Sequence, residues 1–232
     1  MNRRIIAALD TADVAEAVGH VRRLAPFVGA FKIGHALTLS RGLDVVTELQ
    51  DAGAKRIFLD LKFHDIPSVV GLAVREATRR GVWMLTMHVA GGRAMMQAAV
   101  EEAAVVPEHE RPCLLGVTVL TSLDEHALRE DLGVGRSVSD HMLAMSRLAI
   151  DNELDGLVCS PREISLLRGT LGSGPLLVVP GIRPAGAATG DQARTGDPLQ
   201  AQHDGASYLV MGRALVGHPD PESVVRATLA EA

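Results

Sequence analysis

The chain of 232 residues alternates eight short apolar runs with amphipathic stretches of helical spacing, and this alternation limits the folds open to it. The predicted strands cover residues 4–9, 30–33, 56–61, 84–89, 114–119, 156–159, 176–179 and 207–211. The predicted helices cover residues 12–24, 38–52, 68–80, 93–104, 138–152, 161–168, 198–203 and 221–230. The pattern predicts an α/β fold, a (β/α)8 TIM barrel, in a single domain over residues 1–232.

The main alternative fold is an open doubly wound sheet, which usually carries a Gly-rich phosphate-binding turn after its first strand. Here the letters D-T-A-D follow the first strand at positions 10–13, without a glycine. A long connection rich in Gly, Ala and Thr covers residues 184–197 after the seventh strand. Loops of this length often act as lids.

Composition narrows the class of protein. Hydrophobic residues make up 47% of the chain and aromatic residues 3%, so the core is expected to be aliphatic. No apolar stretch approaches the roughly 18 residues that span a membrane, and Asp10 comes too early for a signal peptide. A net charge of −5 without a basic cluster argues against a nucleic-acid partner. Cys113 and Cys159 have no metal-binding spacing and predict buried free thiols in a reducing cytoplasm.

Three charged residues lie at the end of the third predicted strand, in the run F-L-D-L-K-F-H-D-I-P at positions 58–67. Side chains two apart in a strand share a face, so Asp60 and Lys62 are expected to point the same way. Asp65 follows where the strand ends, because Pro67 cannot continue a ladder and suits a helix start. A structural salt bridge would explain an isolated Asp-x-Lys. Three alternating charges at one strand end favour a functional site, because buried charges are costly unless paired.

Asp10 and Lys32 extend this pattern to the ends of the first two strands. The carboxyl ends of barrel strands share one mouth, so these two residues are expected to join Asp60 and Lys62 in an alternating charge network. In such a network, opposite neighbours hold each charge in place and fix its protonation. Taken singly, Asp10 could cap a helix and Lys32 could face solvent. The recurrence across three strands favours the network.

The loops after the seventh and eighth strands are predicted to bind an anion. They carry P-G-I-R at positions 180–183, ending in Arg183, and the pair Gly212-Arg213. These two loops are the usual phosphate-binding place in such barrels. Glycine lets backbone N–H groups approach a phosphate closely, and a guanidinium offers a bidentate contact.

No metal site is predicted. His64 and His88 lie near the mouth, but a barrel metal site needs His and carboxylate ligands that converge from several strands. The matching strand ends carry lysines, whose ammonium groups would repel a cation. His88 is expected to be a hydrogen-bonded residue in or near the site.

Taken together, these motifs resemble the orotidine 5′-phosphate decarboxylase family over nearly the whole chain. The matching segments are A-L-D at 8–10, F-K-I-G at 31–34, F-L-D-L-K-F-H-D-I-P at 58–67, H-V-A-G-G at 88–92, T-V-L-T-S at 118–122, D-G-L-V-C-S at 155–160, P-G-I-R at 180–183, G-D-Q at 190–192 and Y-L-V-M-G-R at 208–213. The resemblance implies a homodimeric barrel that decarboxylates orotidine 5′-monophosphate to uridine 5′-monophosphate without a metal or cofactor. This reaction is the last step of de novo pyrimidine synthesis.

The resemblance also implies a role for each matching residue. Lys62 would protonate C6 of the pyrimidine as carbon dioxide leaves. Asp60 would lie against the substrate carboxylate, and Lys32 would hold Asp60 and contact the ribose. Asp65 would reach into the site of the partner subunit. The remaining expected substrate contacts are Asp10 to a ribose hydroxyl, Thr121 to the pyrimidine ring, and Arg213 and Gln192 to the phosphate, with Gly212 and Arg183 beside them.

One position departs from the family pattern, and two other functions stay open. The family usually has threonine four residues after the last aspartate of the motif, where this chain has Val69, which cannot offer a hydroxyl to the ribose. Related sugar-phosphate decarboxylases and epimerases share D-x-K-x-x-D and the phosphate loops but need a metal, and Lys32, T-V-L-T-S and G-D-Q fit them poorly. A nucleotide-binding protein without activity is the third possibility, and the intact charges argue against it.

Overall fold

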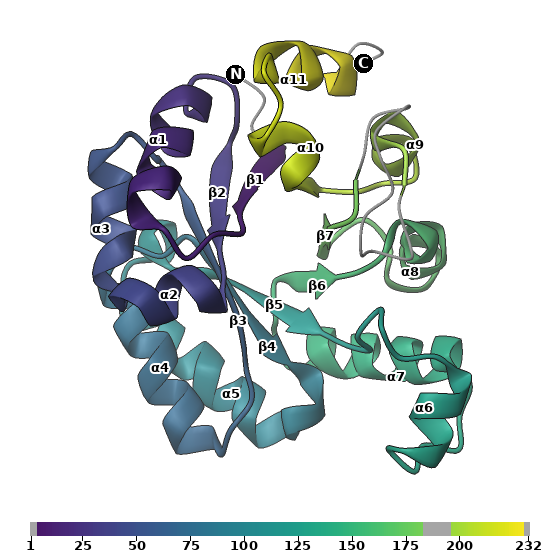
Figure 1. Cartoon of the computed structure of the whole chain (residues 1–232). Coiled ribbons are helices and arrows are strands. Elements are labelled where there is room, and N and C mark those ends of the chain that lie inside the picture. Colours follow the sequence, from purple (N-terminus) through teal and green to yellow (C-terminus); the bar gives the residue numbers. More distant parts are fainter. Residues whose placement is uncertain (1–3, 183–195, 230–232) are drawn as a thin grey trace.

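Eight parallel strands close into a barrel in a computed structural model that describes residues 4–182 and 196–229 (Figure 1). The strands are β1 Ile5–Leu9, β2 Ala30–Ile33, β3 Ile57–Phe63, β4 Met84–His88, β5 Cys113–Val117, β6 Gly156–Val158, β7 Leu176–Val179 and β8 Tyr208–Met211. Each strand pairs with the next, and β8 closes onto β1 with Ile6 opposite Val210. The prediction of a (β/α)8 barrel is confirmed.

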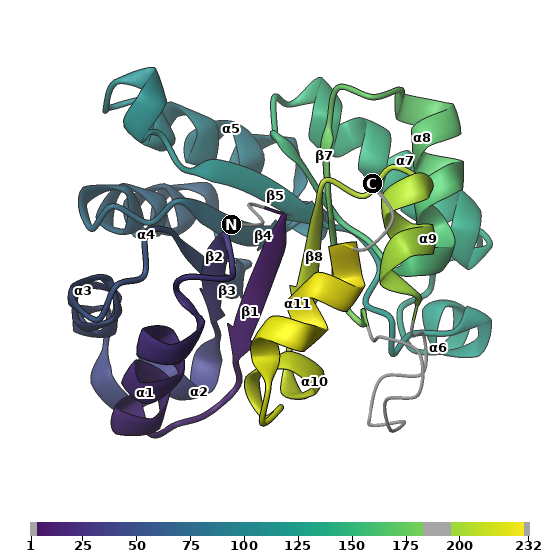
Figure 2. The same ribbon diagram turned by 90° about the horizontal axis from the view of Figure 1, so that it is seen from above.

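Helices lie around the outside of the barrel in both views (Figures 1 and 2). The α-helices are α1 Val14–Leu24, α2 His35–Arg41, α3 Asp44–Asp51, α4 Pro67–Arg79, α5 Gly92–Ala103, α6 Glu125–Glu130, α7 Val138–Asp151, α8 Ile164–Leu171, α9 Pro198–His203, α10 Arg213–Val216 and α11 Pro221–Leu229. Short 3-10 helices cover Val89–Gly91, Glu108–Glu110 and Pro161–Glu163. No helix in the described ranges is both long and apolar enough to cross a membrane.

The helix predicted over residues 38–52 is wrong, because two helices occupy that region. Gly42 follows the last residue of α2 with a φ of 73°, a left-handed conformation that ends the helix and that glycine adopts without steric cost. The short helices α6 and α10 were not predicted, since each is too brief to show a helical period. The start of α4 at Pro67 agrees with the sequence prediction.

Two apolar cores result from the alternation of side chains along the strands. One core fills the barrel interior and consists of Ile6, Ala8, Ala30, Phe58, Met84, Leu115, Val178 and Val210. The other lies between the strands and the surrounding helices. The next inward positions along β2, β3 and β4, two residues after the apolar layer, are Lys32, Asp60 and Thr86. The fold therefore places polar side chains directly above a packed apolar floor.

The close approach of β6 to β7 gives a test of this packing. A Cβ added at Gly156 would overlap the carbonyl oxygen of Leu176 on the neighbouring strand. We expect Gly156→Ala to lower the free energy of unfolding by about 1–3 kcal/mol. The added methyl group would meet backbone atoms, which cannot move aside as the end of a flexible side chain can. Urea denaturation measures the change.

Gly19 provides the matched control. It lies inside α1, and an added Cβ there meets nothing within 4 Å. Gly19→Ala should raise the free energy of unfolding by about 0.5–1 kcal/mol because alanine favours an exposed helix interior. Equal effects of the two substitutions would contradict this account of Gly156.

Candidate active site

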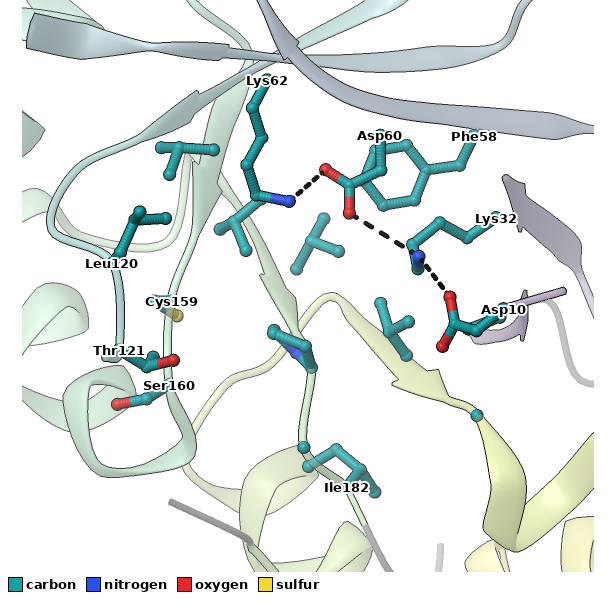
Figure 3. A pocket seen from close by; sticks show the side chains of 18 of the residues that line it. Asp10, Lys32, Phe58, Asp60, Lys62, Leu120, Thr121, Cys159, Ser160 and Ile182 are labelled. Carbon is teal, nitrogen blue, oxygen red and sulfur yellow. Dashed lines mark hydrogen bonds and ion pairs between the residues drawn. The ribbon is translucent and has the colours of Figure 1, made fainter. Parts of the chain in front are cut away.

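A cavity of about 630 Å³ opens at the carboxyl ends of the strands (Figure 3). Residues from the ends of seven of the eight strands, all except β4, line it. They are Ala8, Asp10, Lys32, Phe58, Asp60, Lys62, Val117, Val119, Leu120, Thr121, Val158, Cys159, Ser160, Glu163, Val178, Pro180, Gly181, Ile182, Val210, Gly212, Arg213 and Ala214. Apolar side chains form its inner part, and charged side chains lie near its mouth. This combination suits a ligand that has both a ring and charged groups.

Four charged side chains form a continuous chain along one side of the cavity (Figure 3). Lys62 Nζ donates to Asp60 Oδ1 at 2.9 Å, and Lys32 Nζ lies 3.7 Å from Asp60 Oδ2. Lys32 Nζ also donates to Asp10 Oδ1 at 3.1 Å. The structure thus brings together the four residues of the predicted network, with positive and negative charges in alternation.

The centre of this chain is buried. The side chains of Lys32 and Asp60 are only 14% and 15% exposed. Burial by itself would raise the pKa of the Asp60 carboxyl, but the charges of Lys32 and Lys62 and the hydrogen bonds from Lys62 and Thr86 outweigh it and lower that pKa below its ordinary value. Asp60 is therefore an ionised acceptor at neutral pH, and both lysines face a fixed negative charge.

The third strand is irregular where it carries the site. Lys62 has a φ of 51°, in the left-handed region that residues with a Cβ rarely adopt. The pairing of β3 with β4 shifts register between Leu59 and Phe63. Asp60 and Lys62 do face each other, as alternation along a strand predicts, but the backbone between them is bulged rather than regular. Bulges often lie beside active sites, where they redirect a side chain.

His88 lies at the end of β4, next to this cluster. Its ring centre is 5.3 Å from that of His64. Burial, together with the charges of His64 and Lys62, lowers the pKa of His88. Within residues 4–182 and 196–229, no three His, Cys, Asp or Glu side chains are grouped closely enough to hold a metal ion.

The predicted anion site is only partly described. Pro180, Gly181, Gly212 and Arg213 line the cavity after β7 and β8. Gly181 has a φ of 81°, a turn conformation that favours glycine. Arg183, Gln192 and residues 184–195 of the predicted lid lie outside the described residues. The described part of this region presents backbone and one guanidinium toward the same cavity as the lysines.

Thr121 and Ser160 both line the cavity, and in Figure 3 both are drawn on the side away from Asp10. Ser160 is not among the residues that the sequence predicts for the site. Its backbone N–H donates to Glu163 Oε2 at 2.7 Å in a capping-box arrangement. Its buried hydroxyl has no hydrogen-bond partner among the described residues. A buried hydroxyl without a partner is costly, and a hydrogen bond from Ser160 Oγ to a polar group of a ligand would remove that cost.

Asp65 and Val69 lie apart from the other site residues. Asp65 is exposed, its carboxylate accepts the N–H of Ile66 at 2.6 Å, and it is outside the cavity that the described part of this chain forms. Val69 is 43% exposed in the first turn of α4. Neither residue contributes to the cavity of its own chain.

The ion cluster predicts a measurable change in acid titration. Because the pKa of Asp60 is lowered in the fold, its pairing stabilises the protein above the unfolded value of about 3.9 and is lost as the pH falls through the folded value. In Lys32→Met, burial would still raise this pKa while one opposing charge is gone. We expect Asp60 to titrate at higher pH in that variant, as followed by carboxyl ¹³C chemical shifts.

The exposed residue Lys55 gives the control, and Lys55→Met should leave the Asp60 titration unchanged. The same titration midpoint for Asp60 in Lys32→Met and in the unmodified protein would contradict the assigned electrostatics.

The chain is similar to known proteins over nearly its whole length. The family model described as "Orotidine 5'-phosphate decarboxylase / HUMPS family" matches residues 3–228. The orotidine 5′-phosphate decarboxylase of Moorella thermoacetica is 45% identical over 231 residues, covering 98% of this chain and 91% of the relative. That of Nitrosococcus oceani is 46% identical over 228 residues, covering 98% of this chain and 97% of the relative.

Solved structures show the same likeness. The crystal structure of orotidine 5′-phosphate decarboxylase from Lactobacillus acidophilus matches with a TM-score of 0.84 at 31% identity, covering 99% of each chain. An uncharacterized conserved protein from Geobacillus kaustophilus matches with the same TM-score of 0.84 at 33% identity, covering 97% of this chain and 99% of that one. On the near-complete match to the family model and to these relatives, the chain belongs to the orotidine 5′-phosphate decarboxylase / HUMPS family.

Proposed function

We propose that this chain decarboxylates orotidine 5′-monophosphate to uridine 5′-monophosphate and carbon dioxide, the last step of de novo pyrimidine synthesis, within one domain over residues 1–232. The observation that carries the proposal is the chain Asp10–Lys32–Asp60–Lys62 at the mouth of the cavity. It lies in a protein that is 45% and 46% identical to two relatives named for this activity.

The reaction requires a proton donor next to a carbon that gains negative charge. When the bond from C6 to the carboxylate carbon breaks, its electron pair stays on C6. The Lys62 ammonium stabilises that charge, gives its proton to C6, and regains a proton from solvent. Its bond to Asp60 at 2.9 Å occupies one of three N–H groups, and the contacts of the described residues leave the other two for the substrate.

Asp60 and Lys32 act on the substrate from the same cluster. An ionised Asp60 beside the substrate carboxylate disfavours the bound ground state and favours loss of that carboxylate as neutral carbon dioxide. Lys32 holds Asp60 from its other oxygen and lies 3.1 Å from Asp10 Oδ1, so both can also meet ribose hydroxyls. The charges of Lys32 and Lys62 lower the pKa of Asp60 and so keep that carboxylate ionised.

The rest of the cavity suits the other parts of a nucleotide. Thr121 and the available hydroxyl of Ser160 face the pyrimidine ring in this proposal. Arg213 and the backbone at Gly212 hold the phosphate, together with Arg183 and Gln192. Binding energy from a phosphate distant from C6 can be used to orient the reacting end.

We propose that the reaction needs no metal or cofactor. The description of the matching family model names a second group, HUMPS, beside the decarboxylase. The alternative of a metal-dependent sugar-phosphate enzyme is therefore tested by the chelator experiment below. Two ammonium groups flank the one buried carboxylate of the cluster, and they would repel a divalent cation at that position. The same ammonium groups suit an anionic carboxylate substrate.

We also propose a homodimer in which Asp65 completes the site of the partner subunit. Asp65 is exposed at the start of α4, and Ile66, Val69 and Leu72 follow it at 62%, 43% and 56% exposure. Residues three apart lie on the same side of a helix, so these three form an apolar patch beside the carboxylate. Val69 in place of a hydroxyl residue suits such a patch.

A reducing cytoplasm is the proposed compartment. Cys113 and Cys159 are free thiols, and burial raises the pKa of both, that of Cys113 to about 11. Both thiols therefore stay protonated and unreactive at neutral pH.

The activity is tested by the loss of substrate absorbance on adding orotidine 5′-monophosphate, with and without a chelator. We expect turnover that the chelator does not change. Lys62→Ala should lower kcat at least about 1,000-fold, because it removes both the proton donor and the charge that stabilises C6. Calorimetry should show that this variant still binds uridine 5′-monophosphate.

Lys55→Ala, at an exposed position, serves as the control and should keep full turnover. Absence of turnover by the unmodified protein would refute the proposed activity. Chelator-sensitive turnover would refute the metal-free reaction, and a near-normal rate in Lys62→Ala would refute its role.

The dimer is tested at the apolar patch. Ile66→Glu and Leu72→Glu should yield monomers in sedimentation velocity and lose turnover, because a buried carboxylate without a partner is costly. Leu166→Glu, at a residue of α8 with 43% exposure, should remain a dimer. A monomeric unmodified protein would contradict the proposal.

Mixing two inactive variants tests the shared site separately. In a hybrid of Asp65→Ala and Lys62→Ala subunits, one of the two sites carries both changes and the other carries neither. Random exchange makes half of the dimers hybrids, so about a quarter of full activity should return in a two-fold symmetric dimer. No recovery after proven subunit exchange would show that Asp65 does not act across subunits.

A further inference from the structure

Thr86 is the one residue of β4 that faces the bulge in β3. Leu59 pairs with Leu85 and Phe63 pairs with Met87, so the three residues 60–62 of β3 stand opposite Thr86 alone. Thr86 points into the barrel between Met84 and His88 and is completely buried. It does not belong to the lining of the described cavity.

The hydroxyl of Thr86 contacts both members of the Asp60–Lys62 pair. It accepts the backbone N–H of Lys62 at 3.0 Å and donates to Asp60 Oδ1 at 2.9 Å. A hydroxyl can do both at once, since it carries one donor and two acceptor positions. The same Asp60 oxygen accepts Lys62 Nζ at 2.9 Å. The three groups therefore form a closed ring of hydrogen bonds.

This ring meets two physical needs of the bulge. The register shift interrupts the regular ladder, and a buried Lys62 N–H without an acceptor would be costly. The left-handed backbone at Lys62 also needs support, since such a conformation persists only where its surroundings hold it. Thr86 supplies the acceptor and ties the bulge to the carboxylate that the bulge must face.

We propose that Thr86 is a positioning residue that holds the Lys62 ammonium and the Asp60 carboxylate in their reactive arrangement through one buried hydroxyl. The proposal rests on the decarboxylation proposed above. Thr86 does not touch the substrate. It acts on the Lys62 side chain through the backbone from which that side chain begins, and on Asp60 by a direct hydrogen bond.

The test compares Thr86→Val, which removes the hydroxyl and keeps the branched shape, with Thr86→Ser, which keeps the hydroxyl. We expect kcat for orotidine 5′-monophosphate to fall about 10–100-fold in Thr86→Val with KM within about threefold, because small misplacement of catalytic groups has effects of this size. Thr86→Ser should restore kcat to within about threefold of the unmodified protein. For every variant, kcat is calculated per site that binds uridine 5′-monophosphate, so that misfolded protein does not lower it.

Amide hydrogen exchange at Lys62, followed by NMR, gives a readout that does not depend on activity. The Lys62 N–H should exchange faster in Thr86→Val and at the unmodified rate in Thr86→Ser. Thr78→Val is the matched control, because Thr78 is also buried but its hydroxyl donates to Val74 O within its own helix. That variant should change neither the kinetics nor the exchange at Lys62.

Two outcomes overturn the proposal. Thr86→Val could show the same kcat and the same slow exchange of the Lys62 N–H as the control Thr78→Val. In that case the Thr86 hydroxyl does not hold Asp60 and Lys62 in place. If Thr86→Ser loses as much as Thr86→Val, lost packing rather than the hydroxyl explains the effect. Turnover by the unmodified protein tests the proposed activity separately. Should that fail, the exchange rates at Lys62 still decide whether Thr86 holds the bulge.

Discussion

The site depends on one ion cluster, in which the buried carboxylate of Asp60 lies between two ammonium groups. Removing a carboxylate from water is expensive, and a single partner often does not compensate for it. Here Lys32 approaches one oxygen, and Lys62 and Thr86 bond to the other, so the carboxylate has a defined plane as well as a defined charge. Both lysines are then oriented by a group that cannot rotate freely.

The barrel makes this cluster possible because it brings strand ends to one place and closes the space beneath them. The layer that includes Phe58, Met84 and Leu115 fills the interior directly below Lys32 and Asp60. This apolar layer excludes water from below the charges, so interactions near the floor act in a lower dielectric than those at the mouth. A rigid closed sheet also keeps the distances between charges from neighbouring strands constant, as positioned catalytic groups require.

The sequence predicted the elements better than their irregularities. The alternation of apolar runs with helical stretches was enough to predict eight strands, and the shared mouth of a barrel was enough to predict that Asp10, Lys32 and Asp60 lie in one network. The sequence predicted one helix where α2 and α3 are separated at Gly42, because apolar residues recur at helical spacing on both sides of that left-handed residue. The partners of Thr86 were not predictable, since they follow from a register shift that leaves no periodic signal. Asp65 lies outside the cavity that the described part of its own chain forms, as the proposed role across subunits requires.

The sequence correctly predicted that the side chains of Asp60 and Lys62 point to the same place, but the regular alternation of a strand is not the reason. In a regular strand these side chains would face the same way by the pleat alone. Here Lys62 adopts a left-handed backbone, which costs roughly 1–2 kcal/mol for a residue with a Cβ. Such strain is kept only where neighbouring contacts hold it, and the ion pair with Asp60 and the hydroxyl of Thr86 are those contacts. The strained residue is also the proposed proton donor, so the interactions that bury Asp60 serve to aim the ammonium. The local backbone conformation and the proposed chemistry thus rely on the same three side chains.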